Sequence, residues 1–134
     1  MTPNTLNITL WVIQILLALI SLLSGIFKAS QPVDKLVKSG QTGVQDLSTG
    51  LIKFIGFAEI LIAFGLIFPW WLKIIPILTP LAALFFGIIM ILASRVHYNL
   101  YLKTGNKKER QNSINNLMIL LLCLVLVIAR TLQL

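Results

Sequence analysis

Four apolar stretches, each about as long as a bilayer is thick, constrain this chain more than any other feature. They cover residues 6–27, 51–71, 74–95 and 114–132, and a membrane-spanning helix needs about 20 predominantly apolar residues. Of the 134 residues, 57% are hydrophobic and only 11% are charged, whereas soluble domains have about 45–50% apolar residues. The sequence therefore predicts one all-α domain over residues 1–134, an integral membrane four-helix bundle that crosses the lipid bilayer four times.

Each predicted span gathers its small and polar residues on one helical face. Positions separated by three or four residues share a face of a helix, and helices in lipid pack through small residues and hydrogen bonds. The sequence thus predicts a compact bundle with a small, partly polar interior, and Arg130 at its edge is expected to reach the interface. The faces comprise Gln14, Ala18, Ser21, Gly25 and Lys28 in the first span, Gly56, Glu59 and Ala63 in the second, Ala83, Gly87, Met90, Ser94 and His97 in the third, and Asn116, Leu120, Cys123, Val127 and Arg130 in the fourth.

The connections contain recognisable helix signals. Pro32 is suited to a first helical turn and Gly40 can end one, which predicts a short interfacial helix lying on the membrane in the first loop. Asp46 or Ser48 is expected to cap the second span. Pro76 and Pro80 are expected in the first turns of the third span, where proline is tolerated.

Basic residues are distributed unevenly between the two sides of the predicted bundle. Nine of the eleven Lys and Arg residues flank the first and third loops, while only Lys73 and Arg130 lie on the other side. The positive-inside rule then predicts that loops one and three are cytoplasmic and both termini outside. Membrane orientation and anionic lipid explain the net charge of +7, so no nucleic-acid partner is expected. A signal peptide has basic residues before its apolar segment, and no basic residue precedes the first span here. We therefore expect the first span to be retained.

Glu59 is an acidic residue in the middle of the second apolar stretch. Ionisable groups at membrane depth usually face the bundle interior and carry function. Glu59 follows Lys53 by six residues, which places it about 9 Å deeper. We expect its side chain to point toward Ser21, Ser24 or Ser94. His97 and Lys28 are expected at the rim of the same polar funnel, reaching Glu59 through water if at all.

These six residues form the candidate ligand or proton site, but simpler interpretations stand beside it. His97 at a span end is more often a solvated surface group, and Lys28 more often an anchor at the interface. Glu59 itself can be a protonated, hydrogen-bonded tie between helices. No catalytic residue and no metal ligand is assigned.

The short inventory of reactive side chains excludes several chemistries. His97 is the only histidine, which excludes a haem held by two histidines of one chain, and Cys123 is the only cysteine, which excludes an intrachain disulfide relay. Phosphate-binding loops, zinc-ligand spacings and Ser/His/Asp sets are not found. The chain is therefore not expected to be an enzyme on its own, and its cofactor is left open.

Three segments together resemble the DoxX-like family of small four-helix membrane proteins. They are Gly25-Ile26-Phe27-Lys28, then Ile55-Gly56-Phe57-Ala58-Glu59 with Gly65 and Pro69, and then Pro80, Ala83, Met90, Ala93 and His97. The resemblance implies a four-span protein of a bacterial-type plasma membrane. Some members of that family are associated with quinone-linked oxidation of small sulfur or thiol compounds, and many have no assigned activity.

Three functional hypotheses follow from this combination. The first is a membrane subunit or small-ligand binding module that holds a quinone-like molecule beside a partner oxidoreductase. The second is a small proton-coupled exporter that uses Glu59, although small multidrug exporters carry their membrane glutamate in the first span. The third is a structural membrane protein in which Glu59 is only an interhelical tie.

Overall fold

The computed structural model describes residues 2–134, which form helices and no strand. Four of the helices are long and apolar enough to cross a membrane, as the sequence predicts. In chain order the elements are α1 (Pro3–Ser30), α2 (Val33–Lys38), the 3-10 helix η1 (Thr42–Val44), α3 (Thr49–Leu72), α4 (Leu78–Thr104) and α5 (Lys107–Leu132).

The first connection contains the predicted short helix and cap. α2 starts at Val33, directly after Pro32, and the chain then turns at Gly40 with a φ of 103°, a conformation that favours glycine. Of the two expected caps for α3, Ser48 is the one used, because its side chain accepts a hydrogen bond from the Leu51 backbone N–H. This satisfies one of the free N–H groups at the helix start.

The connection between α3 and α4 differs from the prediction. α4 begins only at Leu78, so Pro76 lies in the preceding turn and the prediction that it belongs to the first helical turn is wrong. Lys73 and Ile75 have positive φ values of 56° and 48° in this turn. In place of a first α-helical turn, the Leu78 N–H donates to the Ile75 carbonyl oxygen and the Thr79 N–H to the Pro76 carbonyl oxygen, which are the i→i+3 bonds of a tight turn. Pro80 does lie in the first turn of α4.

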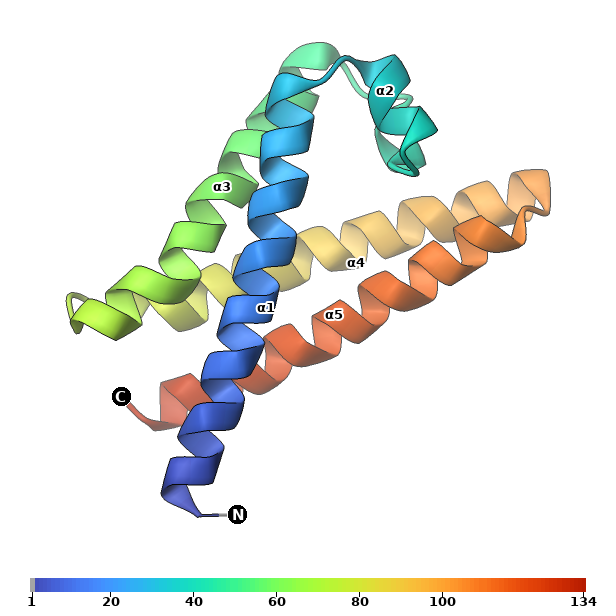
Figure 1. Ribbon diagram of the computed structural model, residues 1–134. Coiled ribbons are helices and arrows are strands. Elements are labelled where there is room, and N and C mark those ends of the chain that lie inside the picture. Colours follow the sequence, from blue (N-terminus) through green and yellow to red (C-terminus); the bar gives the residue numbers. More distant parts are fainter. Residues whose placement is uncertain (1) are drawn as a thin grey trace.

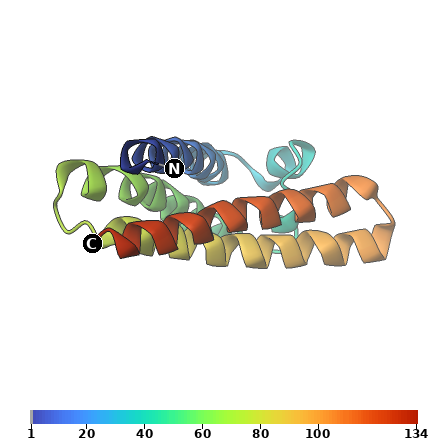
Figure 2. The same ribbon diagram turned by 90° about the horizontal axis from the view of Figure 1, so that it is seen from below.

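The four long helices form two antiparallel pairs, α1 with α3 and α4 with α5. Figure 1 shows the pairs meeting near the chain termini, which we call the terminal side, and separating toward α2, which we call the α2 side. In Figure 2, α4 and α5 are seen lengthwise while α1 is seen nearly end-on, so the pairs cross at a large angle. The bundle is therefore closed on the terminal side only. The sequence predicts a compact bundle and does not predict this separation on the α2 side.

The packed core lies toward the terminal side. Leu10 and Leu17 of α1, Leu66 of α3, Phe86 of α4 and Leu126 of α5 are buried together there. A second, smaller cluster of Leu36, Val44 and Ile52 holds the first connection against α3. The space between these two clusters is where the candidate site lies.

Two glycines allow α1 and α3 to touch close to the α2 side. A Cβ atom built on Gly25 would lie 2.5 Å from the Gly56 carbonyl oxygen, and one built on Gly56 would lie 2.8 Å from the Ala29 nitrogen. Only residues without a side chain permit this approach, as in other small-residue contacts within membranes. The contact brings Lys28, one turn beyond Gly25, next to the α3 face that carries Glu59.

Candidate functional site

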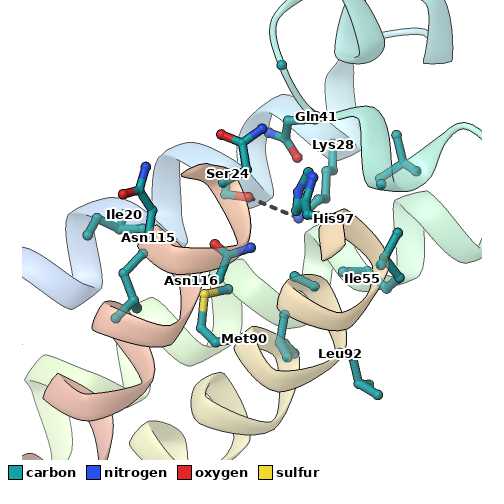
Figure 3. Close-up of a pocket in the computed structure, with 18 of the residues that line it drawn as sticks. Ile20, Ser24, Lys28, Gln41, Ile55, Met90, Leu92, His97, Asn115 and Asn116 are labelled. Carbon is teal, nitrogen blue, oxygen red and sulfur yellow. Dashed lines mark hydrogen bonds between the residues drawn. The ribbon is translucent and has the colours of Figure 1, made fainter. Parts of the chain in front are cut away.

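A cavity of about 610 Å³ lies between the separated helix pairs on the α2 side. All four long helices and the connection from α2 to α3 contribute to its wall, which is mainly apolar (Figure 3). Its polar lining residues include Lys28, Ser24 and His97. The remaining lining residues are Ile20, Gly40, Gln41, Gly43, Val44, Leu47, Leu51, Ile55, Phe86, Ile89, Met90, Leu92, Ala93, Val96, Asn112, Asn115, Asn116 and Ile119.

Lys28 and Glu59 form a direct ion pair beside this cavity. The Lys28 Nζ atom lies 2.5 Å from Glu59 Oε1, and the side chains are 12% and 0% exposed. Glu59 therefore faces the bundle interior, as expected. The expectation that Lys28 reaches it only through water, or serves as an interfacial anchor, is wrong.

The direction of the side chains explains this direct contact. Side chains on a helix lean toward its N-terminus. α1 runs toward the α2 side and α3 runs away from it, so Lys28 leans into the bundle while Glu59 leans toward the α2 side. The two side chains therefore lean toward each other. A count of residues along the helix axes overestimates the difference in depth between Lys28 and Glu59.

The three expected serines take different positions. Ser24 accepts a hydrogen bond from Lys28 Nζ at 3.0 Å, drawn as the dashed line in Figure 3. Ser21 donates to the backbone oxygen of Glu59 at 2.7 Å and not to its carboxylate. Ser94 contacts neither, because its hydroxyl pairs with Ser113 at 2.7 Å. The structure thus brings together Lys28, Glu59, Ser21 and Ser24, and leaves Ser94 in the α4–α5 contact.

His97 belongs to a second polar cluster, which also includes Thr42 and Glu109. His97 Nδ1 lies 2.6 Å from Glu109 Oε2, and the Thr42 hydroxyl donates to Glu109 Oε1 at 2.7 Å. His97 is only 9% exposed, so its interpretation as a solvated surface group is wrong. We call this cluster the Thr42–His97–Glu109 clasp, because it fastens η1 to the ends of α4 and α5.

Glu109 lies in the first turn of α5, ahead of the expected span. Burial by itself raises the pKa of this carboxyl, but the hydrogen bonds with His97 and Thr42 and the nearby imidazole charge bring the pKa below its ordinary value of 4.5. The carboxylate form of Glu109 is thereby favoured. Glu109 therefore contributes a carboxylate to the clasp at neutral pH.

Arg130 closes the bundle at the terminal side. Its Nε donates to Gln14 Oε1 at 2.6 Å and its Nη1 to Asn7 Oδ1 at 3.0 Å, while its guanidinium lies 4.5 Å from the centre of the Trp70 ring. The side chain is 1% exposed and is therefore packed within the protein next to the chain ends, while the expectation that it reaches the membrane interface stays a prediction. The amide and indole partners offer the guanidinium hydrogen bonds and a π face, which makes an inward position favourable.

The comparisons with known proteins place the chain in a family. The family model described as the DoxX-like family matches residues 12–127. The chain belongs to the DoxX-like family. The curated proteins and the solved structures that were searched contain no match to it. The matched range includes every residue of the cavity wall in this DoxX-like protein.

The cavity wall of the DoxX-like protein presents hydrogen-bond donors, and none of the residues that line it carries a carboxylate. Glu59 and Glu109 approach the cavity only through their partners and are not among its lining residues. A lysine ammonium has three N–H donors, and Lys28 uses two of them on Glu59 and Ser24. The third is available to an acceptor in the cavity. Among residues 2–134 no group of three His, Cys, Asp or Glu side chains could hold a metal ion.

Sequence reasoning did not identify Thr42 or Glu109 as part of the site of this DoxX-like protein. For Glu109 only an approximate signal exists, because residues at equal distances from the turn of a helical hairpin lie opposite each other. The pairs His97–Glu109 and Ser94–Ser113 are centred near residue 103, about two residues before Gly105, so a count from this glycine is offset from the observed register. Thr42 has no comparable signal, since η1 reaches it through an irregular connection.

Proposed function

We propose that this DoxX-like protein is a membrane subunit whose cavity binds a small, largely apolar, quinone-like molecule beside a partner oxidoreductase. The observation that carries the proposal is the cavity itself. Its volume of about 610 Å³ falls within the range of about 300–1,000 Å³ found for small-molecule sites. A mostly apolar wall with a few convergent polar groups is also typical of such sites.

The polar groups fit a ligand that accepts hydrogen bonds. Glu59 and Ser24 hold the Lys28 ammonium in place, and its remaining N–H donor suits a carbonyl oxygen of the ligand. Asn112, Asn115 and Asn116 add amide groups to the α5 wall. Held in this way, Lys28 loses little further conformational freedom when the ligand binds, which favours affinity.

A partner is part of the proposal because the chain has no redox group of its own. Its single cysteine, Cys123, is buried in the core, and its single histidine is engaged in the clasp. Electrons for a quinone-like ligand would therefore come from another protein. We propose that this partner docks on the α2 side, for which the distribution of basic residues predicts a cytoplasmic location in a bacterial-type cell.

Ligand binding can be tested with a cavity-filling variant. We suggest titrating the purified protein in lipid nanodiscs with decylubiquinone and comparing Ala93→Trp, in the cavity wall, with Leu121→Trp, whose side chain is 62% exposed on α5. We expect the wild type and Leu121→Trp to bind alike and Ala93→Trp to bind at least about tenfold more weakly, since a filled site loses the apolar contact. Equal binding by all three, or none by the wild type, would refute the proposal.

A structural tie is a second candidate role for Glu59. The observation that favours it is the ion pair with Lys28, which joins α1 to α3 next to the Gly25–Gly56 contact. The exporter hypothesis has less support, because the Glu59 carboxylate is fully buried and already paired. Glu59→Gln distinguishes the two roles. If the pair orients Lys28 for the ligand, decylubiquinone affinity falls, whereas a tie alone changes stability and leaves the affinity as it was.

A further inference from the structure

The cavity opens sideways between α3 and α4, and we infer from this that its ligand is a membrane-dissolved amphiphile. In this arrangement the polar head lies at Lys28 and Ser24, and an apolar tail leaves through the α3–α4 opening into the bilayer. The inference rests on the proposed function and adds the class of ligand and its orientation.

Other parts of the chain border both ends of the cavity along the helix axes, although Gly40 on the α2 side is itself exposed. Toward the terminal side, Phe86 forms the end of the cavity and belongs to the packed core with Leu17 and Leu66. On the α2 side, the connection from Gly40 to Leu47 covers the cavity, and the Thr42–His97–Glu109 clasp fastens it. The wall of the cavity on this side is thus a connection that the clasp holds to α4 and α5.

The lateral opening between α3 and α4 is lined by apolar, exposed side chains. Leu51 on α3 and Leu92 and Val96 on α4 line the cavity, yet they are 44%, 58% and 39% exposed. Residues that both line a cavity and face outward mark the place where the cavity reaches the surface. Leu92 lies within the predicted third span, where the medium outside the bundle is lipid. Leu51 and Val96 lie at the edges of the predicted second and third spans, next to the interface.

The opposite lateral end, between α1 and α5, has one exposed polar side chain, Asn115. Figure 3 shows Ile20 and Asn115 at that end, and Ile55 and Leu92 at the α3–α4 end. The exposed residue at the α1–α5 end is Asn115, which suits a polar group better than a hydrocarbon chain. This difference between the two ends sets the orientation of the ligand. Its head lies toward the polar groups of α1 and α5, and its tail lies toward α3 and α4.

Lys28 fixes the head position independently of this difference. Its Nζ atom is hydrogen-bonded to Ser24 on α1 and paired with Glu59 on α3, so the free donor lies where α1 meets α3. In Figure 3, Lys28 lies beside Ser24 and apart from Leu92. A ligand that contacts Lys28 and also fills the opening must be elongated, with its acceptor at one end.

The test compares two probes that share a head and differ in their tails. Decylubiquinone carries a ten-carbon tail, and 2,3-dimethoxy-5-methyl-1,4-benzoquinone has none. Affinities would be measured in nanodiscs and expressed as mole fraction in the lipid, so that partitioning into the bilayer does not contribute. We expect decylubiquinone to bind wild-type protein at least about tenfold more tightly, because its tail contacts apolar wall along the opening.

Variants at the opening locate the tail. We expect Leu92→Trp to remove most of the tail advantage while leaving the tail-less probe within about twofold of wild type, because only the tail lies there. Val96→Phe narrows the same opening and serves if Leu92→Trp does not fold. Leu121→Trp is the lipid-facing control and is expected to change neither affinity.

The outcomes of this test distinguish failure of the amphiphile inference from failure of the proposed function. Tail-dependent binding that neither Leu92→Trp nor Val96→Phe weakens would overturn the α3–α4 exit and leave the proposed function standing. Equal affinity for the two probes in the wild type would also overturn the amphiphile inference. A wild-type protein that binds neither probe would overturn the proposed function together with the inference.

Discussion

The ion pair between Lys28 and Glu59 leads to a stability prediction that needs no knowledge of the ligand. We expect Lys28→Met to lower the free energy of unfolding by about 3–5 kcal/mol, the cost of leaving one partner of a buried pair uncompensated. Glu59 is fully buried and its Oε2 atom has no hydrogen-bond partner among residues 2–134, so the carboxylate that remains has little to replace the ammonium.

The opposite single variant should be milder. Glu59→Gln keeps a hydrogen-bond acceptor in the same place, and the Lys28 side chain is 12% exposed at the end of α1, where it can turn toward water. Its cost should be that of one charge-assisted hydrogen bond, about 1.5–3 kcal/mol. The asymmetry between the two variants follows from their different burial.

The double variant Lys28→Met/Glu59→Leu measures the coupling between the two residues. Replacing both charges by apolar groups of similar size is often neutral or stabilising, so we expect it to lie within about 1 kcal/mol of wild type or above it. The assay is reversible unfolding by sodium dodecyl sulfate in mixed lipid–detergent micelles, followed by far-ultraviolet circular dichroism. Single-variant effects that simply add in the double variant would refute a direct contact between Lys28 and Glu59.

Three further predictions concern other parts of the chain. Gly25→Leu should destabilise the α1–α3 contact by at least about 1–3 kcal/mol, as overpacking does, because even a Cβ atom would lie 2.5 Å from a carbonyl oxygen; unchanged unfolding in the same micelle assay would contradict it. Because the pKa of Glu109 in the folded protein lies below its ordinary value of 4.5, its contribution to stability should be present above about pH 4.5 and be lost as the pH falls further; an identical acid profile for Glu109→Gln would speak against this. A reporter fused to the C-terminus should be active only outside the cytoplasm, because the basic residues gather on the α2 side; cytoplasmic activity would reverse the orientation.

The secondary structure of this protein follows largely from local signals. Apolar length specifies four long helices, and Ser48 caps α3 because its hydroxyl lies one position before the helix. The small-residue faces predict that Gly25 and Gly56 face the bundle interior, but they do not specify that α1 pairs with α3, because Gly87 of α4 lies on such a face as well. The start of α4 was less predictable, because apolar content continues through the turn and only Pro76 marks the interruption.

The separation of the helix pairs is a property of tertiary packing. A helical face specifies which residues face inward, but it does not specify the crossing angle, which depends on how two sets of side-chain ridges fit together. The cavity exists only because α1 and α3 cross α4 and α5 instead of running along them. Its volume and its lateral opening therefore could not be derived from periodicity.

The candidate site shows the same division between local and tertiary information. Glu59 was identified because a charge in an apolar stretch is unusual, and its inward direction follows from its neighbours on α3. Its partner was misjudged, because a depth estimate along the helix axis omits the lean of the side chains. Thr42 was missed for a different reason: a threonine in an irregular connection carries no periodic signal.

The position of Glu59 behind Lys28 bears on what a membrane carboxylate can do. A carboxylate that lined the cavity would repel acceptor groups of a ligand and would attract cations, which is the chemistry of an exporter. Here the ammonium lies between the carboxylate and the cavity, so the wall presents N–H donors while the pair as a whole is neutral. Burial of a neutral, hydrogen-bonded pair costs less than burial of a lone lysine. Glu59 thus makes it possible for this membrane bundle to present a lysine donor to an apolar cavity, and its influence on a ligand would be transmitted through Lys28.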